Sequence, residues 1–161
     1  MKIDLIVRGI CCLRPGLPGV SENITVRSIV DRFLEHSRVY YFENACQPQV
    51  FIASADWMPR NFYRRIELAF PIEDGVLRER VIREILALSL GDSARARLLQ
   101  PDGSYRRAAA ATDVNANRSQ FQFIALTRAD EDAPRKSADG KAKYPRVQLA
   151  SSPFAAPRLK K

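Results

Sequence analysis

The chain's single histidine, His36, lies in the stretch LEHSRVYYFEN, close to Arg38 and Glu43. An imidazole can donate or accept a proton and a guanidinium can hold two oxygens of a phosphoryl group, so His36 and Arg38 fit phosphate chemistry. In a strand, residues two apart project from one face, whereas Glu43 faces the other side unless the strand twists or bulges. Alternatively, His36 is an ordinary polar residue at a helix-to-strand junction. These residues alone leave both interpretations open.

Polar side chains also follow two other apolar runs. In SADWMPRN, Ser54, Asp56 and Arg60 come directly after a predicted strand, where an open sheet commonly presents groups to a ligand. A solvated loop anchored by Trp57 accounts for the same residues equally well. Arg8 follows the first apolar run, a suitable place for a guanidinium that binds phosphate. We treat these residues as candidates for a phosphate-binding site.

Several common catalytic patterns do not occur in this sequence. The stretch RPGLPG is not followed by Lys-Ser/Thr, so it is no P-loop, and there is no G-x-S-x-G motif. A single histidine cannot form a His-His metal site, and Cys11, Cys12 and Cys46 lack the spacing of metal ligands. We therefore expect no metal site within this chain, and we expect free, reduced thiols.

The candidate residues depend on strands in the first part of the chain. Runs rich in β-branched and aromatic residues, with Pro, Gly and polar breaks between them, predict a strand-dominated region. Asp31 fits the N-cap of a helical turn over residues 31–36. The polar ACQ between two runs predicts an antiparallel hairpin. The predicted strands cover residues 3–9, 24–30, 38–44, 48–57 and 64–72.

An amphipathic helix is predicted over residues 76–90. Its apolar residues recur at helical spacing, with Asp74 as a cap before it and Gly91 at its end. The Pro-Asp-Gly at 101–103 then predicts a second hairpin. We expect one α/β domain over residues 1–107, with a mixed β-sheet flanked by helices.

Residues 108–161 read as a linker and a basic tail. From residue 129 on there are four prolines and no sustained period, which is typical of disorder. The chain carries a formal net charge of +8, but nine Lys and Arg against four Asp and Glu lie after residue 127. Residues 1–127 are thus only mildly basic, which argues against specific nucleic-acid binding. No apolar run is long enough to span a membrane, and we expect a cytoplasmic protein.

Three stretches together resemble a known family. IDLIVRGICCLRPGLPGVSENITVRSIVDRFLEHSRVYYFEN, ASADWMPRNFYRRIELAFPI and ARARLLQPDGSY resemble the C-terminal catalytic region of bacterial polyphosphate kinase of the long, histidine-phosphorylated type, from about Ile3 to Arg106. The resemblance implies a phospholipase D-like α/β fold, of which this chain holds one truncated half of a catalytic pair. It also implies reversible transfer of the terminal phosphate of ATP to polyphosphate, with Mg²⁺, through a phosphohistidine.

The same resemblance implies roles for individual residues. Arg8 and His36 match family positions that contact ATP, with His36 as the second active-site histidine, a general acid or phosphate ligand. Arg38 and Glu43 stand in a degenerate H-x-K-x4-D signature, and we add Ser54, Asp56 and Arg60 as supporting residues by inference. The phosphorylated histidine and the magnesium-binding arginines belong to parts of the family that precede this stretch. We therefore expect negligible kinase activity from the chain alone.

The family resemblance also implies binding partners. They are ATP or ADP, polyphosphate, and the remainder of the kinase or another copy of the chain, in a homo-oligomer. Two other functions stay open. One is a non-catalytic polyanion-binding module that uses Arg8, Arg14, Arg38 and the basic tail. The other is a phospholipase D-like phosphodiesterase, active as a homodimer with two copies of His36 facing each other.

Overall fold

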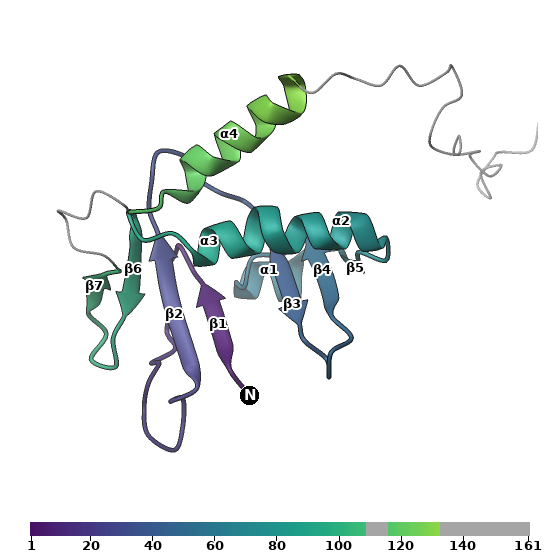
Figure 1. The fold of residues 1–161 in the computed structure, drawn as a ribbon. Coiled ribbons are helices and arrows are strands. Elements are labelled where there is room, and N and C mark those ends of the chain that lie inside the picture. Colours follow the sequence, from purple (N-terminus) through teal and green to yellow (C-terminus); the bar gives the residue numbers. More distant parts are fainter. Residues whose placement is uncertain (109–115, 133–161) are drawn as a thin grey trace, which may run out of the picture.

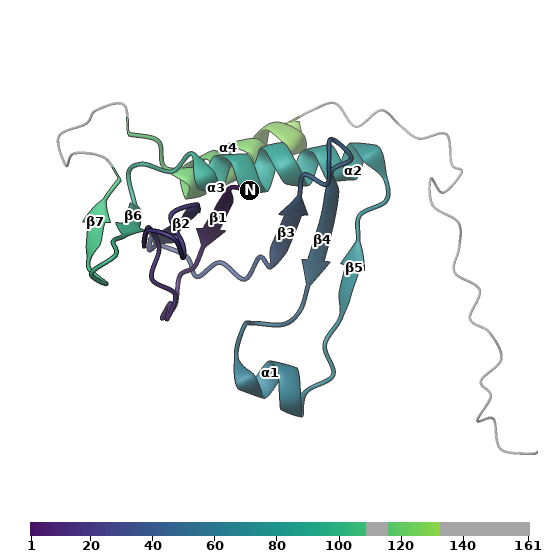
Figure 2. The same cartoon turned by 90° about the horizontal axis from the view of Figure 1, so that it is seen from below.

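The computed structural model describes residues 1–108 and 116–132 and shows a mixed α/β domain with its strands in two sheets (Figure 1). The first sheet has the order β1-β2-β6-β7 and the second the order β3-β4-β5. A helical rod lies across one face of both sheets (Figures 1 and 2). The strands are β1 (Ile3–Ile6), β2 (Ile24–Ile29), β3 (Val39–Phe42), β4 (Gln49–Ala53), β5 (Ala69–Pro71), β6 (Ala96–Leu99) and β7 (Tyr105–Arg107).

The first sheet is mixed. β1 and β2 run parallel, and β6 pairs antiparallel with both β2 and β7. The long Pro/Gly loop between β1 and β2 folds back on itself, because the Ser21 hydroxyl donates to the Arg14 carbonyl at 2.6 Å and accepts from the Leu17 amide at 3.1 Å. Arg14 Nε in turn donates to the Pro101 carbonyl at 2.8 Å, which ties this loop to the predicted turn between β6 and β7.

The second sheet confirms the first predicted hairpin and corrects the strand that follows it. β3 and β4 pair antiparallel around a turn in which Asn44, Ala45 and Cys46 all have positive φ. The sequence predicts a strand over residues 64–72, but only Ala69–Pro71 pairs with β4. The chain before it forms helix α1 (Pro59–Arg64), because Pro59 has a φ that suits the first turn of a helix. The predicted strand is therefore confirmed only for residues 69–71, and residues 65–68 connect α1 to it.

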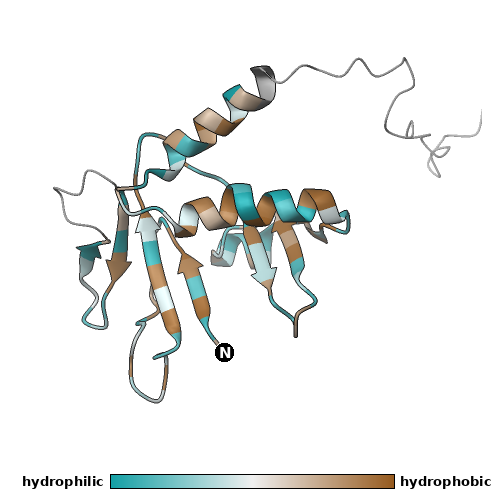
Figure 3. Cartoon of the chain, in the orientation of Figure 1, coloured by the Kyte–Doolittle hydropathy of each residue, from teal (hydrophilic) through white to brown (hydrophobic). Residues whose placement is uncertain are grey.

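The helix predicted over residues 76–90 is confirmed as a continuous rod. It consists of α2 (Gly75–Arg80), a π-helical stretch η1 (Val81–Ala87) and α3 (Leu88–Leu90). Asp74 caps the start, accepting from the Leu77 amide at 2.8 Å. Gly91 ends the rod with φ of −82°, so the end needs no left-handed residue. Apolar bands on the strands and on the rod are visible in Figure 3.

Two further segments differ from the expectation. Residues 31–36 form no helical turn, and the Asp31 carboxylate is used elsewhere. Within the predicted linker and tail, α4 (Ser119–Asp132) is a regular helix that rests against the end of α3. The predicted tail beyond residue 132 lies outside the described residues, as does most of the alanine-rich stretch after β7. No described helix is both long enough and apolar enough to cross a membrane.

The core of the first sheet makes a testable contribution to stability. Val26 in the centre of β2 is fully buried, and Val26→Ala removes two methyl groups and leaves a cavity. We expect the free energy of unfolding to fall by about 2 kcal/mol. Urea denaturation of the chain measures this. Val76→Ala, at a residue that is 72% exposed, is the matched control and should change stability by less than about 0.5 kcal/mol. Equal effects of the two substitutions would contradict the assigned core.

Candidate functional site

The segments that carry Arg8 and His36 leave β1 and enter β3 at the same end of the two sheets (Figures 1 and 2). β1 and β3 run in opposite directions, so the end of β1, which Arg8 follows, and the start of β3, which His36 precedes, face one way (Figures 1 and 2). Both residues are exposed to solvent. The fold therefore brings the segments that carry His36 and Arg8 to one end of the sheets.

Arg38 and Asp56, two further candidates, form an ion pair. Arg38 Nη2 lies 2.7 Å from Asp56 Oδ1, and Nε donates to the same oxygen at 2.8 Å. Arg38 Nη1 also donates to the His36 carbonyl at 2.9 Å. The prediction that His36 and Arg38 project from one face of a strand is wrong, because β3 begins at Val39 and contains neither residue. Arg38 instead fastens the backbone of His36 to the loop that follows β4.

Glu43 is not part of this group. It accepts a hydrogen bond from the Tyr41 hydroxyl, which raises the pKa of Tyr41. β3 lies between Glu43 and His36, and its four residues in extended conformation advance about 3.3 Å each. Glu43 therefore does not join His36 and Arg38 in one site within this chain.

Ser54 and Arg60 have different environments. Ser54 binds the returning chain: its hydroxyl donates to the Glu67 carboxylate and accepts from the Leu68 amide at 3.0 Å. Arg60 lies on α1, which projects from the second sheet (Figure 2), and it makes no ion pair with any described residue. Ser54 has a structural role here, and Arg60 is not brought to His36 by a contact.

The aromatic residue of the same motif is exposed. Trp57 is 78% accessible and stacks on Tyr40 with ring centroids 6.4 Å apart, and its indole N–H donates to the Tyr40 hydroxyl at 2.8 Å. Neighbouring Asn61 is buried, and its side-chain oxygen has no hydrogen-bond partner among the described residues. Trp57 thus anchors the loop to β3, and Asp56 anchors it to Arg38 just before β3, as in the interpretation of a loop anchored by Trp57.

Sequence reasoning missed a polar cluster that joins the chain before His36 to the start of α4. Asp31, with 2% of its side chain exposed, accepts from Arg118 Nε at 2.8 Å and Nη2 at 2.6 Å. The hydrogen bonds from Arg118 lower the pKa of Asp31, and Asp31 raises the pKa of Arg118. Asp92, also buried, accepts from the amide and the hydroxyl of Ser119 at 2.8 Å each. No local signal could have revealed these contacts, because the partners lie far apart in the sequence.

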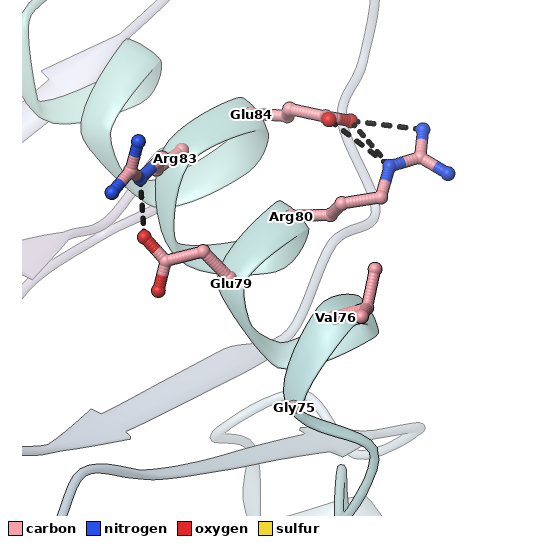
Figure 4. A pocket seen from close by; sticks show the side chains of 6 residues that line it. All are labelled: Gly75, Val76, Glu79, Arg80, Arg83 and Glu84. Atoms are coloured by element: carbon pink, nitrogen blue, oxygen red, sulfur yellow. Dashed lines mark hydrogen bonds and ion pairs between the residues drawn. The ribbon is translucent and has the colours of Figure 1, made fainter.

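The pocket on the helical rod contains none of the candidate residues. It is lined by Gly75, Val76, Glu79, Arg80, Arg83 and Glu84 (Figure 4). Its charged side chains bind one another as i,i+4 pairs, with Arg80 Nε 3.0 Å from Glu84 Oε1. Within residues 1–108 and 116–132 no group of three His, Cys, Asp or Glu side chains is placed to hold a metal ion.

Fold and site together define a partial α/β domain that brings the segments of a histidine and an arginine to one end of its sheets. A family model, described as polyphosphate kinase C-terminal domain 2, matches residues 1–120. The chain is 60% identical over 107 residues to polyphosphate kinase from Burkholderia ambifaria, covering 66% of this chain and 16% of that protein. It is 61% identical over the same length to polyphosphate kinase from Paraburkholderia phytofirmans, with the same coverage.

A solved structure has the same fold. The crystal structure of polyphosphate kinase from Porphyromonas gingivalis superposes with a TM-score of 0.74 and 41% sequence identity, over 83% of this chain and 20% of that one. The chain belongs to the polyphosphate kinase C-terminal domain family. It spans only about a sixth of the length of the curated relatives.

Proposed function

We propose that this chain forms the part of a polyphosphate kinase site that binds the phosphates of ATP and of polyphosphate. The supporting observation is that the segments of Arg8 and His36 come to one end of the sheets and expose both residues, with the His36 backbone held by Arg38. His36 acts there as a phosphate ligand or general acid and Arg8 as a cation for phosphate oxygens. Arg38 contributes by holding His36, since its own guanidinium is engaged by Asp56.

The remaining chemistry requires the rest of a kinase. Phosphoryl transfer depends on groups placed on both sides of the reacting phosphate. We propose that the phosphohistidine and the Mg²⁺ ligands come from the parts of the family that this chain does not cover, in a phospholipase D-like pair of domains and in a cytoplasmic homo-oligomer. The chain alone then binds nucleotide weakly and makes no polyphosphate.

An apolar surface on the second sheet supports such a partner. The segment from Trp57 to Phe70 exposes large apolar side chains, with Ile66 fully accessible and Tyr63 85% accessible. Several large exposed apolar side chains in one segment are typical of an interaction surface. We name it the α1 surface, and it consists of Trp57, Met58, Phe62, Tyr63, Ile66, Leu68 and Phe70.

Complementation tests the proposed function. We expect that mixing this chain with a purified fragment of the Burkholderia ambifaria kinase that lacks the matching region restores ATP-dependent polyphosphate synthesis, measured as acid-insoluble radioactive phosphate. Ile66→Asp places a charge on the α1 surface and should weaken complementation about tenfold or more. Val20→Asp, at an apolar residue that is 76% exposed and lies outside that surface, is the matched control. Absence of synthesis in every mixture, with both partners folded, would overturn the proposal.

A further inference from the structure

The segment that carries His36 has no helix or strand of its own. It joins the end of β2 to the start of β3 at residues 30–38, and most of its side chains are exposed. A segment of this kind must be fixed by side-chain contacts if it is to hold one catalytic geometry. The Arg38 contacts described above fix only its last residues.

The start of α4 supplies the missing contacts. Gln120 pairs with the backbone of Phe33 in both directions: its Nε2 donates to the Phe33 carbonyl at 2.8 Å, and its Oε1 accepts from the Phe33 amide at 2.9 Å. The same Nε2 donates to Glu35 Oε1 at 2.8 Å. Gln120 is buried, so these bonds are protected from water. It therefore holds the chain on both sides of Leu34, directly before His36.

Arg118 completes the attachment at the beginning of the segment. It binds Asp31 with two donors, and its guanidinium lies over the Phe121 ring at 3.9 Å. Two donors in a fixed fork leave the carboxylate little freedom to rotate. Arg95 lies 3.6 Å from the same carboxylate. Together Arg118 and Gln120 bind the segment at three residues before His36, namely Asp31, Phe33 and Glu35.

We propose that Arg118 and Gln120 are positioning residues that hold the His36 segment in its phosphate-binding geometry. This inference rests on the proposed function of His36. It assigns a role to the start of α4, which carries none of the candidate residues. The geometry around His36 then depends on residues that lie more than eighty positions further along the sequence.

The test uses the full chain and its single histidine. The His36 Cε1–H proton gives the only histidine resonance of that type in the NMR spectrum, and titration with ATP or with polyphosphate reports binding at that side chain. For Gln120→Ala we expect about tenfold weaker ATP binding, a changed His36 resonance, and faster hydrogen exchange of the Phe33 amide. Thr127→Ala, at an exposed residue further along α4, is the control and should leave all three unchanged.

A charge exchange separates positioning from general loss of structure. Gln120→Glu places two carboxylates together at Glu35 and removes the donor to Phe33, so it should weaken ATP binding at least as much. Adding Glu35→Gln removes the repulsion between the two carboxylates and returns an amide donor to that pair, though not the donor to Phe33. It should therefore restore part of the affinity and of the exchange protection. Arg118→Lys keeps the charge but loses the fork, and it should speed exchange of the Arg32 and Phe33 amides.

The outcomes are distinguishable. If wild-type chain shows no His36 response to ATP or polyphosphate, the proposed function fails, and the positioning role in phosphate binding fails with it. If the wild type responds and Gln120→Ala responds with the same affinity and unchanged Phe33 exchange, the positioning role alone is wrong. If Gln120→Glu loses ATP affinity and adding Glu35→Gln restores none of it, the positioning role is also wrong, because the loss would then indicate general destabilisation.

Discussion

Replacing His36 by alanine is expected to slow polyphosphate synthesis in the complemented kinase about 10²–10⁴-fold. A positioned proton donor or acceptor in phosphoryl transfer contributes about 10²–10⁴-fold to the rate. His36 is the one histidine of this chain, so no neighbouring imidazole can replace it. The rate should therefore fall by about that factor, measured under saturating concentrations of the partner fragment.

Matched variants make the result specific to the imidazole. Ser37→Ala changes the next residue, which is also exposed, and should keep the wild-type rate. His36→Gln keeps a hydrogen-bond donor without a titrating group, and its rate should lie between those of wild type and His36→Ala. A wild-type rate for His36→Ala would remove His36 from the site. Salt-sensitive polyphosphate binding that survives in His36→Ala, without synthesis in any mixture, would favour a polyanion-binding module instead.

Replacing Asp31 by asparagine is expected to cause a large loss of stability. The substitution keeps the shape of the side chain but leaves Arg118 without its counter-charge, while 2% of the Asp31 side chain is exposed. Breaking this pair on one side costs about 2 kcal/mol, because a quarter of the Arg118 side chain is exposed and its charge is partly hydrated. Urea denaturation at neutral pH measures it. Asp4→Asn, which breaks the exposed pair with Lys2 at 3.4 Å, is the control and should cost less than about 1 kcal/mol.

The Asp31 effect has a defined pH dependence. Its pKa is lowered in the folded chain from an ordinary value of 3.8, chiefly by the hydrogen bonds from Arg118. As the pH falls, the Asp31 carboxylate therefore binds a proton in the unfolded chain before it does so in the folded chain. The stabilisation by the Asp31–Arg118 pair is present above pH 3.8 and is lost as the pH falls through the lower pKa of the folded chain. The difference in unfolding free energy between wild type and Asp31→Asn should be constant from pH 7 to about 5 and shrink below about 4. A difference that grows on acidification would contradict the assignment.

The elements that sequence reasoning placed well are the ones with local signals. The helix over residues 75–90 has a cap at Asp74 and an apolar stripe, and the two hairpins have turn residues between their strands. Each of these signals lies within a few residues of the structure it predicts. The predicted strand over residues 64–72 is confirmed only at 69–71, and the predicted turn at Asp31 is wrong, because apolar runs and capping residues also occur in other conformations.

Some residues of the candidate site could also be predicted from local sequence features, and others could not. Arg8 and His36 could be chosen from the sequence, since an arginine after a strand and a lone histidine in a distinctive motif are local features. The pairing of Arg38 with Asp56 could not, because it depends on how the loop after β4 returns to the start of β3. Ser54 was a reasonable candidate by type, but only its contacts with Glu67 and Leu68 show that it binds the chain itself.

By itself, the sequence determined the strands and the helix of the domain, the family resemblance, and the presence of one histidine suited to phosphate chemistry. Only the tertiary structure decided that α4 holds the His36 segment, through Arg118 with Asp31 and Gln120 with Phe33. The physical reason is that turn residues and hydrophobic periodicity act over one or two turns of chain. A hydrogen bond between residues 87 positions apart depends on the packing of everything between them.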